Sequence, residues 1–140
     1  MSGRLLAVDW GEKRIGLALS DESQTLAQPL ATLTRRAGKR FPMQQLREHL
    51  DAHHPVGVIV GLPLTPEGHE GDAARAARAA GDLIAEKTGL PVTYVDERMT
   101  TARAHRAIRD LGGGTRGRKD EVDQLAAVVL LQGYLDAQAR

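Results

Sequence analysis

Short apolar runs separated by polar turns predict several β-strands. Residues 5–9 form an apolar run that ends on the carboxylate Asp9, and a polar turn over 11–14 separates it from a second run at 15–19. That spacing is typical of a hairpin. A weaker strand is expected over 28–33. The β-branched run 58–60, which we expect residues 61–63 to stop, indicates a buried strand, and 91–97 predicts a further one.

Helical periodicity fills most of the remaining chain. Phe41, Leu46 and Leu50 share one face of a predicted helix, and the alanine-rich stretch 71–87 predicts another that ends at Gly89. A third helix is expected from about residue 100 to 111, then a mobile basic loop over 112–119. A last helix is expected from about 120 to 137. Its predicted inward positions are Val122, Leu125, Ala126, Val129 and Leu130.

This order of elements predicts an α/β fold in a single domain covering residues 1–140. Three antiparallel strands come first and βαβ crossovers follow, so we expect a mixed five-stranded sheet with helices on both faces. No apolar run approaches the roughly 20 residues of a membrane span, and no signal-peptide segment is evident. We therefore expect a soluble, cytoplasmic protein.

Composition limits the chemistry available. The chain has no cysteine, which excludes thiolate metal sites, and only 3% aromatic residues, which disfavours reading of single strands by base stacking. The formal net charge is +1, but basic residues gather in two segments, where they suit contact with a polyanion or form solvated surface. These residues are Arg35, Arg36, Lys39 and Arg40 in the first segment, and Arg103, Arg106, Arg109, Arg116, Arg118 and Lys119 in the second.

Three carboxylates occupy special places in this pattern. Asp9 ends one predicted strand, Glu97 follows another, and Asp123 lies in the first turns of the last helix. In open α/β sheets functional groups collect at the carboxyl ends of strands, where Asp9 and Glu97 would meet if their strands are parallel neighbours. Mg²⁺ and Mn²⁺ prefer such hard oxygen ligands. Two ions roughly 3.5–4 Å apart can activate water against a phosphodiester.

Other interpretations of these carboxylates stay open at this stage. Asp9 could begin a turn, Glu97 could pair with Arg98, and Asp123 could simply favour a helix N-terminus. Asp96, Asp120 and Glu121 are rival ligands by position. Glu121 is disfavoured, because two residues along a helix correspond to a rotation of about 200°.

Four segments in order resemble one known family. Asp9–Gly16 (DWGEKRIG) is similar to the D-x-G-x-K-R-I-G signature of the YqgF/RuvX nucleases, and residues 60–63 to their V-G-L-P strand end. Residues 96–101 resemble the D-E-R-x-[ST]-T segment, and Lys119 with 123–127 the K-x-x-x-D-x-x-A-A helix. The resemblance spans essentially the whole chain. The departures are Trp10 within the first motif and the turn 66–68.

The resemblance implies a ribonuclease-H-like fold related to the RuvC junction resolvases, and a metal-dependent nuclease. Its acidic triad falls on Asp9, Glu97 and Asp123, which would hold Mg²⁺ or Mn²⁺, two ions being expected. Substrates implied by the family are the precursor of small-subunit ribosomal RNA and four-way DNA junctions. Resolving junctions by paired nicks usually needs a symmetric dimer, so a homodimer remains an open expectation.

Basic residues beside the triad are the expected contacts for phosphate. They are Lys13, Arg14, Arg98, Arg118 and Lys119.

Two other functional classes share features with this sequence. A nucleic-acid-binding adaptor without catalysis would not need three acidic residues near phosphate unless a metal intervened. The D-x-G-x-K segment also resembles the first phosphate segment of actin-like ATPases, which clamp nucleotide between two such domains, whereas 140 residues supply one.

Overall fold

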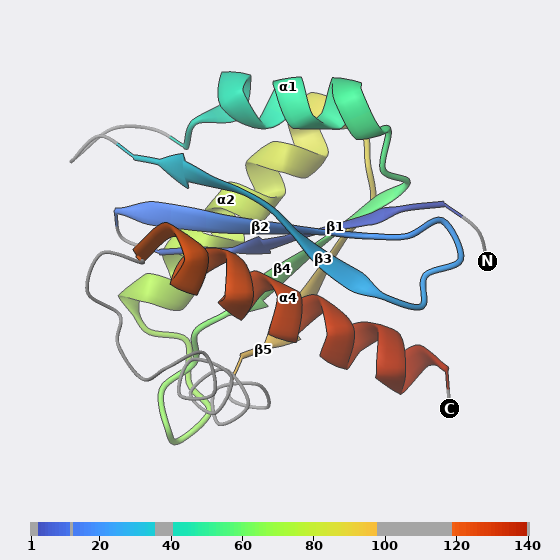
Figure 1. The fold of residues 1–140 in the computed structure, drawn as a ribbon. Helices are drawn as coiled ribbons and strands as arrows, with labels where there is room; N and C mark the ends of the chain where they lie inside the picture. Colours follow the sequence, from blue (N-terminus) through green and yellow to red (C-terminus); the bar gives the residue numbers. More distant parts are fainter. Residues whose placement is uncertain (1–2, 12, 36–40, 98–118, 140) are drawn as a thin grey trace.

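One mixed five-stranded sheet organises the part of the chain that the structure describes (Figure 1). This computed structural model describes residues 3–11, 13–35, 41–97 and 119–139, without the side chains of 119–123. The strands are ordered β3-β2-β1-β4-β5 across the sheet. Their bounds are β1 Leu5–Asp9, β2 Arg14–Ser20, β3 Ala27–Thr34, β4 Gly57–Leu62 and β5 Val92–Asp96.

Strand direction brings three carboxyl ends to one edge of the sheet. β1 pairs antiparallel with β2, and β2 with β3, whereas β1–β4 and β4–β5 are parallel. The predicted mixed sheet with antiparallel strands first is therefore confirmed. β1 and β5 are not neighbours, because β4 lies between them. Their carboxyl ends still share an edge, since all three strands run the same way.

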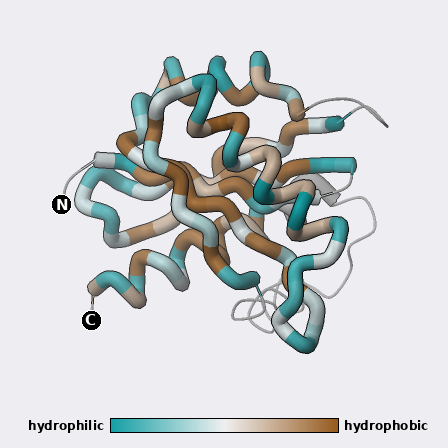
Figure 2. Tube along the Cα trace, turned by 180° about the vertical axis from the view of Figure 1, so that it is seen from behind, coloured by the Kyte–Doolittle hydropathy of each residue, from teal (hydrophilic) through white to brown (hydrophobic). Residues whose placement is uncertain are grey.

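Helices cover both faces of the sheet, as the sequence predicts. α1 (Met43–His53) and α2 (Asp72–Thr88) lie on one face, and α4 (Lys119–Gln138) on the other (Figure 1). Each face has its own apolar core, and apolar residues concentrate in the central strands in Figure 2. Leu6 and Val8 of β1 belong to the α1/α2 core, whereas Ala7 belongs to the α4 core. Successive strand residues thus serve opposite layers.

Two predicted boundaries, the end of β4 and the start of α4, differ from the structure. β4 continues through Gly61 and Leu62, where β5 pairs with it, and stops only at Pro63. Lys119 is the first residue of α4 and not part of a loop. The predicted helix over 100–111 and the loop 112–118 lie outside the described residues.

The buried face of α4 is rotated relative to the predicted one. Of the predicted inward positions with described side chains, Leu130 is buried, whereas Leu125, Ala126 and Val129 are half-buried. The fully packed positions are Ala127, Leu130, Leu131 and Leu135. Apolar residues occur on all sides of this helix, so hydrophobic periodicity does not select one face.

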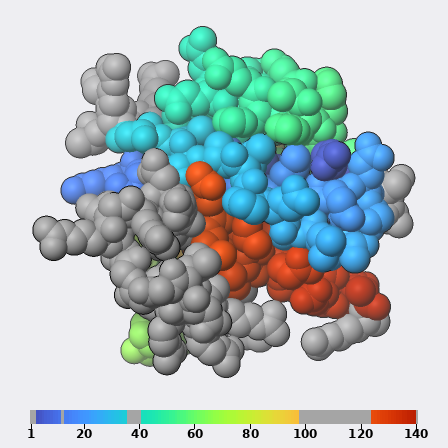
Figure 3. Space-filling view, viewed as in Figure 1, coloured from blue at the N-terminus to red at the C-terminus, as the bar shows by residue number. Residues whose placement is uncertain are grey.

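Side-chain amides attach α4 to the β2–β3 hairpin. Gln132 accepts a hydrogen bond from the backbone N–H of Ala27 at 2.9 Å and donates one to the carbonyl of Thr25 at 3.0 Å. Gln124 donates to the Thr32 hydroxyl at 3.1 Å. In Figure 3, β3 lies between α1 above and α4 below. No helix within the described residues is long and apolar enough to cross a bilayer.

Leu131→Ala should destabilise the protein by about 2–5 kcal/mol, because it leaves a cavity between α4 and the sheet. Leu131 is fully buried in the α4 core. Leu26→Ala is the matched control, since Leu26 is 59% exposed and its truncation should change stability by less than about 0.5 kcal/mol. Urea unfolding measures both. Equal losses for the two variants would contradict the assigned face of α4.

Candidate active site

Asp9 stands at the carboxyl end of β1, on the face that α4 covers. Ala7, two residues earlier, packs in the α4 core, and side chains alternate along a strand. Asp9 is paired in register with Gly16 of β2 and is half-buried. A carboxylate in this position is shielded from much of the solvent, so its charged form needs polar or cationic groups nearby to stabilise it.

Glu97 directly follows β5 and belongs to the same face. Val95 packs in the α4 core, so by alternation Asp96 falls on the opposite face and Glu97 returns to the α4 side. The Glu97 N–H donates to the carbonyl of Leu62 at 3.1 Å, which extends the β4–β5 pairing past the end of β5. This geometry favours Glu97 over its rival Asp96 as the partner of Asp9.

Gly61 provides the space in which the Glu97 side chain lies. A Cβ added at Gly61 would be 2.5 Å from Oε1 of Glu97 and 2.7 Å from its Cγ. The carboxyl group therefore lies on the surface of β4, the strand between β1 and β5. Val60 pairs with Val8, so the next residue of β4, Gly61, lies in register with Asp9. The two carboxylates thus flank one bare strand position.

Asp123 is placed by the backbone only. It lies in the first turns of α4, four residues before Ala127 and seven before Leu130, both buried against the sheet. Asp120 precedes Ala127 by seven residues, so helix position does not separate the two. Among the residues whose side chains are described, no group of three possible metal ligands comes together. The assignment of Asp123 stays a prediction.

The predicted phosphate contacts are described only in part. Lys13 is exposed in the β1–β2 turn, beside the half-buried Arg14 that begins β2. The Lys13 carbonyl accepts the N–H of Arg35 at 2.8 Å, which joins this turn to the end of β3. Arg98, Arg118 and the side chain of Lys119 lie outside the described residues.

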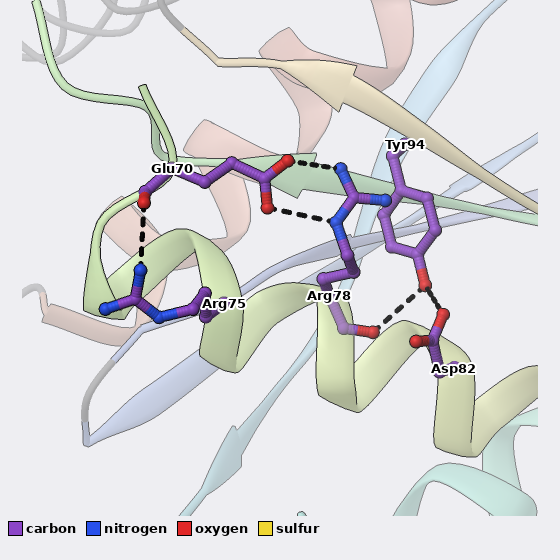
Figure 4. Close-up of polar contacts among 5 residues, drawn as sticks. All are labelled: Glu70, Arg75, Arg78, Asp82 and Tyr94. Atoms are coloured by element: carbon purple, nitrogen blue, oxygen red, sulfur yellow. Dashed lines mark hydrogen bonds and ion pairs between the residues drawn. The ribbon is translucent and has the colours of Figure 1, made fainter. Parts of the chain in front are cut away.

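A polar network fixes the β4–α2 loop beside this edge (Figure 4). Arg78 of α2 donates two hydrogen bonds to the Glu70 carboxylate, at 3.0 and 2.7 Å, and its guanidinium lies 4.7 Å above the Tyr94 ring centroid. The Tyr94 hydroxyl donates to the Arg78 carbonyl at 3.0 Å and to Asp82. The network therefore joins the loop, α2 and the strand that precedes Glu97.

The contacts within this network shift the pKa values of Glu70 and Tyr94. The hydrogen bonds from Arg78 lower the pKa of the Glu70 carboxyl group. Burial, followed by the hydrogen bond to Asp82, raises the pKa of Tyr94 to about 12. The charged form of the Glu70 carboxylate is thus stabilised, while Tyr94 stays neutral.

A mixed sheet in this order, with helices on both faces, is a ribonuclease-H-like fold. Solved structures agree in fold: RuvC from T. thermophilus, in complex with a Holliday junction substrate, matches with a TM-score of 0.59 at 18% identity, covering 98% of this chain and 96% of RuvC. A second solved structure of Thermus thermophilus RuvC gives a TM-score of 0.56 at 18% identity, covering 97% of this chain and 96% of RuvC.

Sequence comparison identifies the family. The RuvX family, described as Holliday junction resolvase, matches residues 3–137. A protein of Lactococcus lactis subsp. cremoris named "Putative pre-16S rRNA nuclease" is 40% identical over 141 residues, covering 99% of this chain and 98% of the relative. A relative of the same name from Cutibacterium acnes is 42% identical, covering 97% and 84%. The chain belongs to the RuvX family and is a nuclease.

Sequence reasoning missed Gly61, although a signal was present. A glycine in a β-branched run often marks a position where another group approaches the backbone closely, and here that group is Glu97.

Gly61→Ala should lower the rate of phosphodiester cleavage by about a hundredfold, because the new methyl group displaces the Glu97 carboxylate by roughly 1 Å. Gly71→Ala is the matched control, since its nearest neighbour would be the Thr65 methyl at 3.7 Å. Cleavage kinetics and circular dichroism separate lost activity from lost fold. A folded Gly61→Ala protein with wild-type rate would contradict the placement of Glu97.

Tyr94 should form tyrosinate only near its pKa of about 12, as measured by ultraviolet titration and assigned with Tyr94→Phe. Asp82→Asn should move this pKa downward, because it removes a charged acceptor. The folded-state pKa is raised above the usual value near 10. The stability from Tyr94 is therefore present below about pH 10 and is lost as pH rises toward 12. A titration unaffected by Asp82→Asn would argue against this hydrogen bond.

Proposed function

We propose that this nuclease uses divalent metal ions, Mg²⁺ or Mn²⁺, held by Asp9, Glu97 and Asp123, to hydrolyse phosphodiester bonds. The observation that supports the proposal best is the Glu97 carboxylate lying over the bare backbone of Gly61, in register with Asp9. Among the described residues, Asp9 and Glu97 flank a strand position that itself carries no side chain.

The donor chemistry fits such ions. Carboxylate oxygens are the hard ligands that Mg²⁺ and Mn²⁺ prefer, with water and substrate phosphate completing the coordination. Two acidic side chains brought together in a half-buried place repel each other, and a cation relieves that repulsion. Asp123 enters the proposal through its position on α4, one turn before Ala127.

Bound there, the ions would lower the pKa of a water molecule and offset the charge that develops on the phosphate. Asp9, on the central strand β1, would hold the ions together with Glu97 and Asp123. Hydrolysis would join the water oxygen to phosphorus, break the bond to the 3′ oxygen and leave a proton on that oxygen, giving a 5′-phosphate and a 3′-hydroxyl. Lys13 and Arg14, in the turn after Asp9, would bind flanking phosphates.

For substrate we propose structured nucleic acid, either precursor ribosomal RNA or branched DNA. The relatives' names support the first and the family description the second. Recognition by backbone charge and shape suits both. Either substrate would be met in the cytoplasm. Cleavage of a four-way junction and of precursor ribosomal RNA, assayed side by side, distinguishes them. Solution mass tests whether junction resolution involves a homodimer.

Asp9→Asn should reduce cleavage by at least about 10³-fold while nucleic-acid binding is kept, because one ligand charge is removed and the surface is unchanged. Asp51→Asn, on the exposed face of α1, is the matched control and should cleave at the wild-type rate. Cleavage is measured with Mg²⁺, Mn²⁺ or EDTA, and binding by gel shift. Undiminished cleavage by Asp9→Asn, or cleavage in EDTA, would refute the metal site.

A further inference from the structure

A pocket of ≈ 530 Å³ opens at the same edge of the sheet as the carboxylates. Its volume is within the range of about 300–1,000 Å³ that ligand pockets occupy. Loops after β1, β3 and β4 meet the first turns of α2 around it. The lining residues are Trp10, Gly11, Arg35, Pro63, Asp72, Ala73 and Ala76.

Trp10 places this pocket next to the candidate active site. It follows Asp9 directly, so the two Cα atoms are about 3.8 Å apart. Alternation sends the two side chains to opposite faces, Asp9 toward α4 and Trp10 toward the α1/α2 core, against which it packs. A nucleic-acid strand crossing this edge with one phosphate at Asp9 would bring an adjacent nucleotide to the pocket.

The aromatic wall of the pocket is held in place on several sides. The Trp10 ring stacks with Phe41, with centroids 6.1 Å apart and planes inclined by 15°. The Arg35 guanidinium lies 4.2 Å from the Trp10 centroid and donates to the Gly11 carbonyl at 3.4 Å. A wall positioned in this way loses little conformational entropy when a ligand binds.

The lining chemistry suits a flat, neutral, polar-edged group. Trp10, Pro63 and the two alanines form apolar walls, to which Arg35 and Asp72 add one charge of each sign. Asp72, the acidic residue of the lining, is ion-paired with Arg75, and a base can pack its faces on the apolar walls. Arginine planes and aromatic rings are common partners of unstacked bases.

We propose that this pocket binds the unpaired nucleobase of the nucleotide next to the scissile phosphate. The inference rests on the proposed nuclease function, since it takes Asp9 to mark the scissile position. The pocket would add one contact with a base to a surface that is otherwise suited to the charge and shape of the nucleic-acid backbone. The protein would thereby favour cleavage beside a nucleotide that can leave its stack.

Trp10 is the only tryptophan in the chain, so its fluorescence reports directly on the pocket. The probes are a short single-stranded oligoadenylate and an abasic strand of equal length. They are titrated into the full chain carrying Asp9→Asn, which is expected to hold nucleic acid without cutting it. We expect the oligoadenylate to change Trp10 emission and to bind about tenfold more tightly than the abasic strand, as one base contact on an aromatic wall allows.

A matched pair of variants localises the effect. Ala73 and Ala79 are both exposed on α2, but only Ala73 lines the pocket. Ala73→Leu should fill it and weaken oligoadenylate binding about tenfold, whereas Ala79→Leu should keep the affinity within about twofold.

The outcomes separate the two proposals. Equal affinity for the abasic strand and unchanged emission, with wild-type cleavage intact, would overturn the base pocket alone. Loss of affinity in both leucine variants would also overturn it. A base-dependent emission change in the Asp9→Asn protein, together with a wild-type protein that cleaves neither substrate, would uphold the pocket and overturn the proposed nuclease site.

Discussion

The arrangement of the acidic edge depends on the absence of a side chain at Gly61. Glu97 arises from β5, two strands away from β1, and reaches the middle of the edge only because β4 has bare backbone there. Any larger residue would meet the carboxylate inside van der Waals distance. The parallel run of β1, β4 and β5 supplies the direction, and the glycine supplies the room.

Alternation along the strands then divides the edge into two chemical surfaces. Ala7, Ile59 and Val95 point toward α4. Counting on in steps of two residues along β1 and β5, the next residues on that side are Asp9 and Glu97. The intervening residues point toward α1 and α2, and at the ends of these two strands they are Trp10 and Asp96. Because each strand serves two cores, an acidic surface and an aromatic pocket can be built from adjacent residues without competing for space.

Much of the fold could be predicted because its signals are local. β1 was predicted to the residue, since an apolar run ended by a charged group has clear limits, and Gly89 ends α2 in the left-handed conformation expected of a C-cap. The end of β4 was not predicted, because pairing with β5 overrides the breaking tendency of Gly61. The buried face of α4 was not predicted either, because its apolar residues surround the helix.

The candidate site was predictable in part for the same reason. Asp9 and Glu97 stand at predicted strand ends, and strand direction brings both to one edge of the sheet. The path of the Glu97 side chain over Gly61, and the pocket beside Trp10, depend on tertiary contacts between segments far apart in sequence. Local pattern carries no information about such contacts.

The position of α4 in the chain has a consequence for when the protein becomes competent. This helix is synthesised after every strand that it covers, and its contacts with the β2–β3 hairpin join residues separated by 105 and 107 positions. Until α4 docks, Ala7, Ala18 and Ile59 have no apolar partner layer. Docking of α4 also brings the carboxylate proposed as the third metal ligand. Under the proposed function, a growing chain acquires its third metal ligand only when that last helix is in place, so closure of the second core and completion of the metal site would coincide.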